Sequence, residues 1–306
     1  MNYNIVQDKN RIILKDMDDF EPKHIFECGQ AFRWKLEEDN SYTTIAFNRV
    51  LNVKKEDKDI ILSNTNLEDF NNIWYDYFDL GRDYGEIKKE LSKDPILKEA
   101  IEYGDGIRIL NQEPFETIIS FIISANNQIP RIKRSIELIS QYYGEKILHC
   151  NYTDTFCHPE GREESYEYYG FPTPEKLSKI NPEDLREKCK VGFRDKRIVE
   201  TSKIIANKEI VLDNIFNMNR QEGKELLMTL PGVGPKVSDC ILLFAFNKDD
   251  AFPVDVWVKR VMEHFYLKED TNVKHIGEHG ARIFGSLAGF AQQYLFYYAR
   301  EEEIGK

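Results

Sequence analysis

The stretch Leu230-Pro231-Gly232-Val233-Gly234-Pro235-Lys236 decides how the second half of the chain folds. The spacing of apolar residues predicts one helix over residues 221–230 and another over residues 235–246. Gly232 and Gly234 permit backbone angles closed to other residues, so the two helices can join through a very tight turn. The N–H groups of such a turn can approach a phosphate closely. An ordinary helical hairpin would need the same glycines, so the turn alone establishes no function.

Lys236 is the first candidate for chemistry beside this turn. Pro235 fits the first helical position, which places Lys236 in the first turn, where the helix dipole disfavours a cation. We therefore expect its amine to be neutral enough to act as a nucleophile. Cys240 lies four residues later and shares the same helix face.

Asp255 is the second candidate, in the segment Phe252-Pro253-Val254-Asp255-Val256-Trp257. The residues after it have a helical pattern, and Asp255 stands where an N-cap belongs. Capping alone would justify an aspartate. A carboxylate held by backbone N–H groups also stays ionised, and it could stabilise a positive charge that develops nearby.

Farther from the turn, the N-terminal part of the chain reads as short strands over residues 11–15, 42–47, 49–53 and 59–63. After about residue 67 the pattern becomes helical. Strands followed by helices predict an α+β fold, with a twisted antiparallel sheet and helices in residues 1–105. Residues 106–306 are expected to form a mostly helical region of two subdomains with the active site between them. Residues 149–168 read as a polar loop insertion.

The composition narrows the class of protein. The 306 residues are 41% hydrophobic, enough for a sizeable core, and no apolar run reaches the length of a membrane helix. The N-terminus lacks a secretory signal, so we expect a cytoplasmic location. The five scattered cysteines read as reduced thiols, and the spacing of His149-Cys150 and Cys157-His158 does not match a zinc site. We expect no metal.

The net charge of −11 argues against a protein that coats DNA non-specifically. Local basic faces are still possible, because salt confines electrostatic fields to about 8–10 Å. Positive charges gather between Arg186 and Lys203, and a smaller cluster comprises Arg131, Lys133 and Arg134. Most such clusters are only solvated faces, so the charge pattern alone carries little weight.

The hairpin stretch followed by Pro253-Val254-Asp255 resembles the signature of the helix-hairpin-helix DNA glycosylases. The lysine and aspartate together point to the bifunctional members, with Lys236 as nucleophile and Asp255 as the carboxylate that assists it. Gly232 and Gly234 would then hold the DNA backbone. Endonuclease III and the adenine glycosylases carry a four-cysteine iron–sulfur cluster after the aspartate. No cysteine follows Cys240, so that cluster cannot form here. The adenine and alkylpurine glycosylases typically lack the lysine.

Four further segments resemble 8-oxoguanine DNA glycosylase, in that family's order. They are Cys28-Gly29-Gln30-Ala31-Phe32-Arg33-Trp34, Ser124-Ala125-Asn126-Asn127-Gln128-Ile129-Pro130-Arg131, Val191-Gly192-Phe193-Arg194 and Gly289-Phe290-Ala291-Gln292-Gln293-Tyr294-Leu295-Phe296. The resemblance implies that the main-chain carbonyl of Gly29 accepts the hydrogen on N7 that distinguishes 8-oxoguanine from guanine. It also implies that Gln292 reads the Watson–Crick edge while Phe296 and Cys240 sandwich the ring. An aromatic at helical spacing is more often a core residue, although the pair Gln292 and Phe296 makes that reading weaker.

The same resemblance assigns residues to the opposite strand. Asn126, Arg131 and Arg194 would contact the orphaned cytosine, and Phe193 would be an aromatic wedge that helps to kink the duplex. Phosphate binding is an equal alternative for Arg194. Trp257 stands where animal members place a histidine, which leaves a phosphate contact there open, and the insertion is longer than the resemblance predicts.

The sequence therefore predicts a bifunctional glycosylase that excises 8-oxoguanine opposite cytosine and nicks the strand by β-elimination. We expect a monomer without cofactors that binds double-stranded DNA containing oxidised guanine. It would be associated with the nucleoid in a bacterium, or nuclear in a eukaryote. Two alternatives are a glycosylase for another damaged purine, such as an alkylated base, and a non-catalytic helix-hairpin-helix DNA-binding module. The latter would have no use for Lys236 with Asp255.

Overall fold

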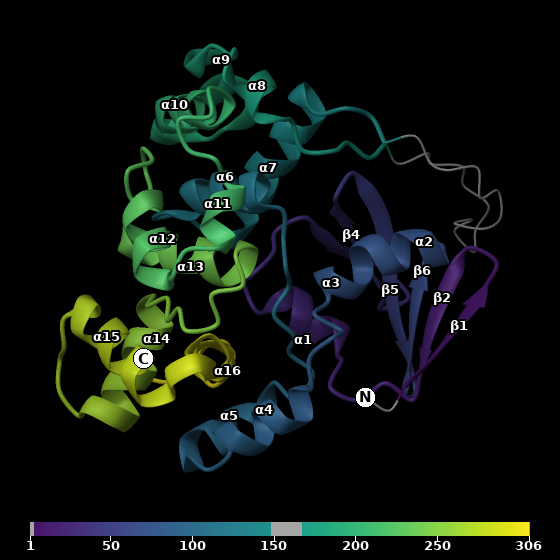
Figure 1. Cartoon of the computed structure of the whole chain (residues 1–306), viewed down its shortest axis with the longest axis vertical. Coiled ribbons are helices and arrows are strands. Elements are labelled where there is room, and N and C mark those ends of the chain that lie inside the picture. Colours follow the sequence, from purple (N-terminus) through teal and green to yellow (C-terminus); the bar gives the residue numbers. More distant parts are fainter. Residues whose placement is uncertain (1–2, 148–166, 306) are drawn as a thin grey trace.

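The computed structural model describes residues 3–147 and 167–305 (Figure 1). The strands are β1 (Asn4–Asp8), β2 (Arg11–Lys15), β3 (Trp34–Leu36), β4 (Tyr42–Ala46), β5 (Arg49–Glu56) and β6 (Asp59–Ser63). The α-helices are α1 (Pro22–Glu27), α2 (Leu67–Asp69), α3 (Tyr75–Tyr77), α4 (Tyr84–Leu91), α5 (Pro95–Tyr103), α6 (Pro114–Ser124), α7 (Ile129–Tyr143), α8 (Pro174–Leu177), α9 (Pro182–Cys189), α10 (Asp195–Ala206), α11 (Asp213–Phe216), α12 (Arg220–Leu227), α13 (Pro235–Ala245), α14 (Val256–Val261), α15 (Val273–Phe284) and α16 (Ala288–Glu301). Short π and 3-10 segments are η1 (Phe70–Trp74), η2 (Gly192–Arg194), η3 (Met262–Leu267) and η4 (Gly285–Leu287). This order of elements confirms the predicted α+β class.

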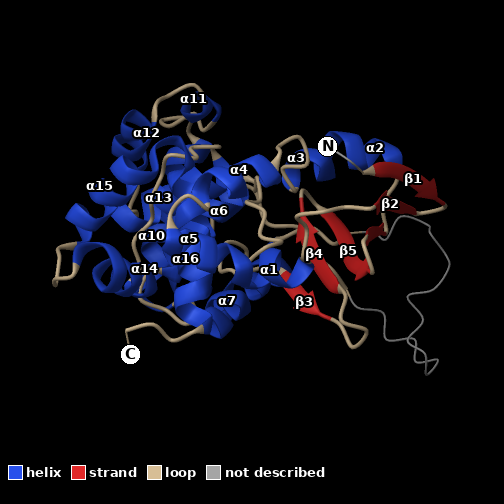
Figure 2. Ribbon diagram, turned by 90° about the horizontal axis from the view of Figure 1, so that it is seen from below, coloured by secondary structure: helices blue, strands red, loops and turns tan. Residues whose placement is uncertain are grey.

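Within the described residues, six strands form one antiparallel sheet in the order β1-β2-β6-β5-β4-β3 (Figures 1 and 2). The sequence pattern predicts β2, β4, β5 and β6, although β5 runs to Glu56 rather than ending at residue 53. It does not predict β1 or β3, which lie at the two edges. Strand β1 is almost wholly exposed, and β3 has only three residues, so neither carries an alternating pattern long enough to predict a strand.

The sheet packs against its own hydrophobic cluster. Ile12 and Leu14 alternate with partly or fully exposed residues along β2, so one face of that strand is buried. This face meets Phe26 from α1, together with Trp74 and Phe78 from the segment that crosses the sheet. The cluster fixes the position of α1, whose C-terminal end carries the segment that begins with Cys28.

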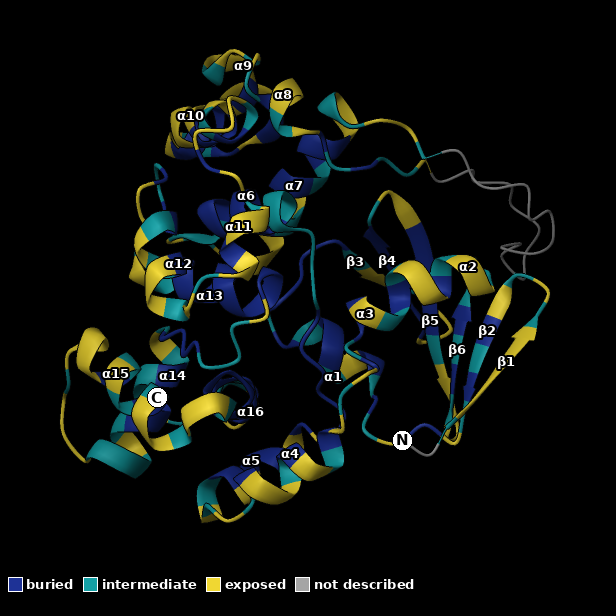
Figure 3. Cartoon of the chain, in the orientation of Figure 1, coloured by how far each residue is buried: buried dark blue, intermediate teal, exposed yellow. Residues whose placement is uncertain are grey.

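The helical part has a second hydrophobic cluster, visible as the buried interior among α6, α13 and α16 (Figure 3). Helix α5 packs against α16, and α6 against α13. Tyr84, Ile87 and Leu97, which precede residue 105, belong to this cluster rather than to that of the sheet. A domain boundary near residue 105 stays a prediction; the packing joins α4 and α5 to the helices that follow.

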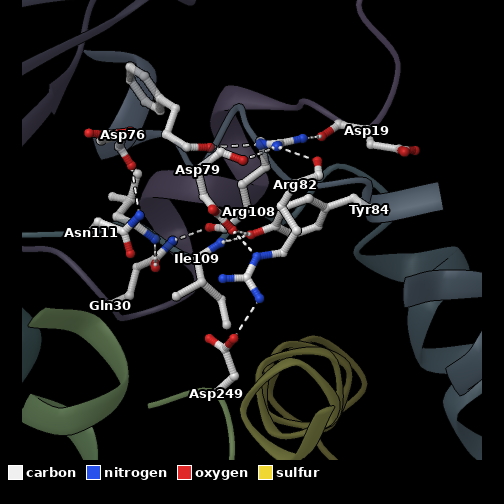
Figure 4. Close-up of polar contacts among 12 residues, drawn as sticks. Asp19, Gln30, Asp76, Asp79, Arg82, Tyr84, Arg108, Ile109, Asn111 and Asp249 are labelled. Atoms are coloured by element: carbon white, nitrogen blue, oxygen red, sulfur yellow. Dashed lines mark hydrogen bonds and ion pairs between the residues drawn. The ribbon is translucent and has the colours of Figure 1, made fainter. Parts of the chain in front are cut away.

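A buried arginine joins the two parts (Figure 4). The guanidinium of Arg108 donates to the carbonyls of Phe78 at 2.8 Å, Asp19 at 3.1 Å and Asp79 at 2.5 Å. Its Cζ atom also lies 4.0 Å from the ring centroid of Tyr84. Because burying a charge is costly unless hydrogen bonds compensate, this network fixes the strand-bearing part against the helices.

Candidate active site and DNA-binding face

The predicted hairpin is formed by α12, the turn and α13. A capping box between Asn219 and Glu222 begins α12, and Gly234 is the N-cap of α13. Gly232 has a φ of +92°, which L-residues rarely adopt, and a β-carbon there would lie 2.9 Å from Cδ of Arg197. Gly234 has ordinary extended angles, but a β-carbon there would meet nothing within 4 Å. The turn thus needs glycine at 232, and at 234 it leaves open space beside the helix N-terminus.

Lys236 lies in the first turn of α13 and is partly buried. Its Nζ atom is 5.4 Å from the ring centroid of Phe121 on α6. That ring packs between Phe32 and Phe244, at centroid distances of 5.5 and 5.6 Å. Lys236 therefore has a largely apolar surrounding, and Phe32 brings the segment that contains Gly29 close to it.

The protonation of Lys236 differs from the sequence expectation. Burial lowers its pKa, but the electrostatic interactions with Cys240 and Asp255 raise it, and the net pKa lies above the usual value for lysine. Burial in turn raises the pKa of the Cys240 thiol, an effect that Lys236 opposes. The direction of the change at Lys236 is opposite to the one that the helix dipole alone predicts, so Lys236 needs to lose a proton before it can attack.

Asp255 is the N-cap of α14, as its position in the sequence predicts. Its Oδ1 atom accepts hydrogen bonds from the backbone N–H groups of Trp257 at 3.0 Å and Val258 at 2.9 Å. These bonds fix the carboxylate at the start of α14, while its charge acts on Lys236. The capping role and an electrostatic role are therefore compatible in the same side chain.

Helix α16 brings Gln292 and Phe296 to the same region. Gln292 is buried, and its Oε1 atom accepts a hydrogen bond from Nε2 of Gln293 at 2.9 Å. Gly29 touches Phe296 although 267 positions separate them: a β-carbon on Gly29 would lie 3.2 Å from Cε1 of that ring. Gly29 also has a φ of +80°. The structure thus brings Gly29 and Phe296 into contact, with Gln292 one turn earlier on the same helix.

Gln30 holds the Gly29 segment in place, a role that the sequence interpretation missed. Its Nε2 atom donates to the carbonyls of Ile25 and Arg108, both at 2.8 Å, and its Oε1 atom accepts from the N–H of Leu110 at 2.9 Å. Its own carbonyl accepts from Gln112 at 2.8 Å. The sequence does offer one clue to this role: Gln30 stands between Gly29 and the apolar residues Ala31 and Phe32, where its side chain is expected to be buried. A buried amide needs several hydrogen-bond partners, so it ties together the segments that supply them.

Replacing Gly29 with alanine should reduce base excision at least ~10-fold while leaving cleavage of a preformed abasic site unchanged. The left-handed φ costs an L-residue roughly 1–2 kcal/mol, and the new methyl group would displace the Phe296 ring. Single-turnover assays on both substrates measure this. Gly285→Ala is the matched control, because Gly285 also has a positive φ but open space beside it. Equal loss in both variants would contradict a role of the Gly29–Phe296 contact.

The residues assigned to the opposite strand form a second group. Asn126 and Arg131 are exposed, and Phe193 is exposed at 57%, an unusual position for a phenylalanine. Arg194 is buried instead: it donates to the carbonyls of Ala125 and, at 3.1 Å, of Asn126, and its Cζ atom lies 4.4 Å from the Phe193 ring centroid. In this conformation Arg194 holds the Asn126 loop and the aromatic ring together rather than facing solvent.

This second group is joined to the hairpin. The Cζ atom of Arg197 lies 5.3 Å from the Phe193 ring centroid, and its stem lies against Gly232. Arg260 similarly lies 4.9 Å from the ring centroid of Trp257, the residue that departs from the family pattern. The hairpin, the exposed phenylalanine and the Asn126 loop therefore adjoin one another through arginine stems.

Further features of the described residues concern buried thiols, metal ligands and membrane-spanning helices. Cys28, Cys189 and Cys240 are buried free thiols, and residues 3–147 and 167–305 contain no cluster of side chains suited to a metal. No helix in those ranges has the length and apolar character to cross a membrane. The insertion predicted at residues 149–168, with Cys150 and Cys157, falls almost entirely outside the described residues.

Comparisons with known proteins identify the family of the chain. Residues 119–284 match the model of the HhH-GPD superfamily of base excision DNA repair proteins, and residues 12–118 match the 8-oxoguanine DNA glycosylase N-terminal domain. The chain belongs to the helix-hairpin-helix base excision superfamily. Within it, the chain is a member of the 8-oxoguanine DNA glycosylase family, which confirms the resemblance read from its motifs.

Relatives and solved structures cover most of the chain. A probable N-glycosylase/DNA lyase of Methanothermobacter thermautotrophicus is 38% identical over 69% of each chain. An Arabidopsis thaliana N-glycosylase/DNA lyase is 29% identical over 89% of this chain and 75% of the relative. The 8-oxoguanine glycosylase/lyase of Clostridium acetobutylicum, solved with double-stranded DNA that has cytosine opposite 8-oxoguanine, is 47% identical, covers 99% of this chain and 100% of that one, and has a TM-score of 0.92. The enzyme class is thus DNA glycosylase with AP lyase activity.

Proposed function

We propose that this protein flips 8-oxoguanine out of duplex DNA, excises it preferentially opposite cytosine, and then nicks the strand. The observation that carries the proposal is the contact of Gly29 with Phe296, next to the segment whose Phe32 packs against the apolar surroundings of Lys236. Base recognition and the nucleophile thereby lie in one region. The family to which the chain belongs supports the same reaction.

Base recognition is assigned to Gly29, Cys240, Gln292 and Phe296. The carbonyl of Gly29 would accept the hydrogen on N7 of 8-oxoguanine, where guanine offers a lone pair. Because Gln30 ties this backbone segment down through four hydrogen bonds, the carbonyl cannot turn to accommodate guanine. Gln292 would exchange its bond with Gln293 for the edge of the base, and Phe296 and Cys240 would stack on its two faces.

The chemistry is assigned to Lys236 and Asp255. Once deprotonated, the amine of Lys236 attacks C1′, and the bond from C1′ to N9 of the base breaks with its electrons going to the leaving base. Asp255 stabilises the positive charge that develops on the sugar. Ring opening gives a Schiff base between Lys236 and C1′. Loss of a proton from C2′ then expels the 3′ oxygen, which nicks the strand 3′ to the lesion.

The duplex would lie against the hairpin and the loop of Asn126. The N–H groups beside Gly232 and Gly234 suit a phosphate, since side chains are absent there. Arg131 and Asn126, both exposed, suit the orphaned cytosine, and Phe193 suits a wedge between bases. We propose that the protein acts as a monomer, in the compartment that holds the DNA.

Strand cleavage of duplexes that hold 8-oxoguanine opposite each of the four bases tests this proposal. We expect cytosine to give the fastest cleavage, and borohydride to trap a covalent complex on the same duplex. A parallel duplex with an alkylated purine serves as the comparison. Release of the alkylated base without release of 8-oxoguanine would overturn the proposed substrate, and absence of a trapped complex would overturn the Schiff base.

A further inference from the structure

Arg300 connects the two segments that recognise the base. It lies on α16, one turn after Phe296, and its side chain is 20% exposed. Its Nη1 atom donates a hydrogen bond of 2.6 Å to the carbonyl of Glu27, and its Cζ atom lies 5.4 Å from the ring centroid of Phe296. A single side chain thus touches the aromatic ring and the backbone that leads into Gly29.

The bond to Glu27 has a clear structural reason. Glu27 is the last residue of α1, and the final carbonyls of a helix have no partner within it. A cationic donor is the favoured partner at this end, because the helix dipole is negative there. Cys28 then ends the helix, and Gly29 leaves it with a positive φ. Arg300 therefore fixes where α1 stops and where the Gly29 segment begins.

Other contacts hold the guanidinium itself in one orientation. Its Nε and Nη2 atoms lie 3.2 and 3.0 Å from Oε1 of Glu301, and its Cζ atom is also 5.4 Å from the ring centroid of Tyr297. Arginine presents its donors in a planar fork, so bonds to Glu301 and Glu27 together restrict how the group can turn. The aromatic contacts add cation–π attraction.

We infer that Arg300 is a positioning residue for base recognition, which sets the separation between the Gly29 backbone and the Phe296 ring. This inference rests on the proposed excision of 8-oxoguanine. Arg300 acts through Gly29 and Phe296 and does not take part in the attack of Lys236. It follows that Arg300 governs removal of the base but not cleavage of DNA from which the base has already gone.

The test compares Arg300→Met with the unmodified protein on two duplexes, one with 8-oxoguanine opposite cytosine and one with a preformed abasic site. Methionine keeps an apolar stem of similar reach and removes the donor. We expect the single-turnover excision rate to fall between about 10-fold and 100-fold, since small misplacement of recognition groups has effects of this size. Cleavage at the abasic site should stay within twofold. Arg300→Lys, which keeps a charged donor, should recover part of the excision rate.

Arg282→Met on α15 is the control, because Arg282 is exposed and its side chain contacts His279 on the same helix. Unchanged excision in Arg300→Met would overturn the inference. An equal fall on both duplexes would do the same, because it would indicate general damage to the fold. If the unmodified protein cleaves the abasic duplex but releases no 8-oxoguanine, the proposed function fails and the inference falls with it.

Discussion

Replacing Lys236 with glutamine should abolish borohydride trapping and lower the rate of 8-oxoguanine excision by at least roughly 10⁴-fold. The amine is the proposed source of the bond to C1′, and no other lysine lies in the first turn of α13. Glutamine fills similar space without charge, so the apolar contact with Phe121 should persist. Gel analysis of trapped complexes and single-turnover assays measure the two effects.

Binding provides the control for this variant. Lys236→Gln should still bind a duplex with 8-oxoguanine opposite cytosine, which fluorescence anisotropy can measure, because the hairpin and the base-recognition residues are unchanged. Trapping at the normal level would rule out Lys236 as the nucleophile. The pH dependence of the unmodified protein is a further check. At pH values below the raised pKa of Lys236, each rise of one pH unit should increase the neutral fraction of Lys236 about tenfold, and the excision rate should increase with it.

Replacing Asp255 with asparagine should lower excision by roughly 10²–10³-fold, the usual effect of removing one group that stabilises a charge in the transition state. Asparagine caps a helix about as well as aspartate, so the bonds to Trp257 and Val258 should survive. The free energy of unfolding of Asp255→Asn should therefore stay within about 0.5 kcal/mol of that of the unmodified protein. Single-turnover kinetics measures the effect of losing the charge on excision. Chemical denaturation measures whether the helix cap, and with it the stability of the protein, is kept.

Asp255→Asn should also change the pKa of Lys236 in a defined direction. The Asp255 charge raises the pKa of Lys236, so removing that charge should lower it and move the pH profile of excision to lower pH. Asp255→Ala is the comparison, since it removes charge and cap and should also destabilise the protein by about 1 kcal/mol. An Asp255→Asn protein with normal excision would show that the residue serves only as a cap.

The parts of the fold that could be predicted are those written locally in the sequence. Gly232 and Pro235 mark the hairpin because one permits a positive φ and the other suits the first turn of a helix. Strands β2 and β6 are predictable because each is a short run of branched apolar residues between polar turns. Asp255 was recognisable as a cap for the same reason: its bonds reach only two and three residues along the chain.

The other parts of the fold and of the site depend on contacts between segments that are distant in the sequence, and local sequence patterns do not predict such contacts. The touch between Gly29 and Phe296 was implied only by family resemblance, and the bond from Arg300 to Glu27 was not predicted. The helix dipole alone predicts a lowered pKa for Lys236, whereas the neighbouring Cys240 and Asp255 raise it. Arg194 was expected to face DNA, but its guanidinium satisfies loop carbonyls that no periodicity reveals.

The meeting of Gly29 with Phe296 has a consequence for synthesis of the protein. Gly29 is made together with the strands of the sheet, which can fold soon after they emerge because they are close together in the chain. The partner ring, on α16, is made 267 residues later. Until α16 is made, the chain lacks both the Phe296 ring and the buried α16 residues of the helical core. On the proposed function, selection of a damaged base would therefore begin only when α16 has folded against that core.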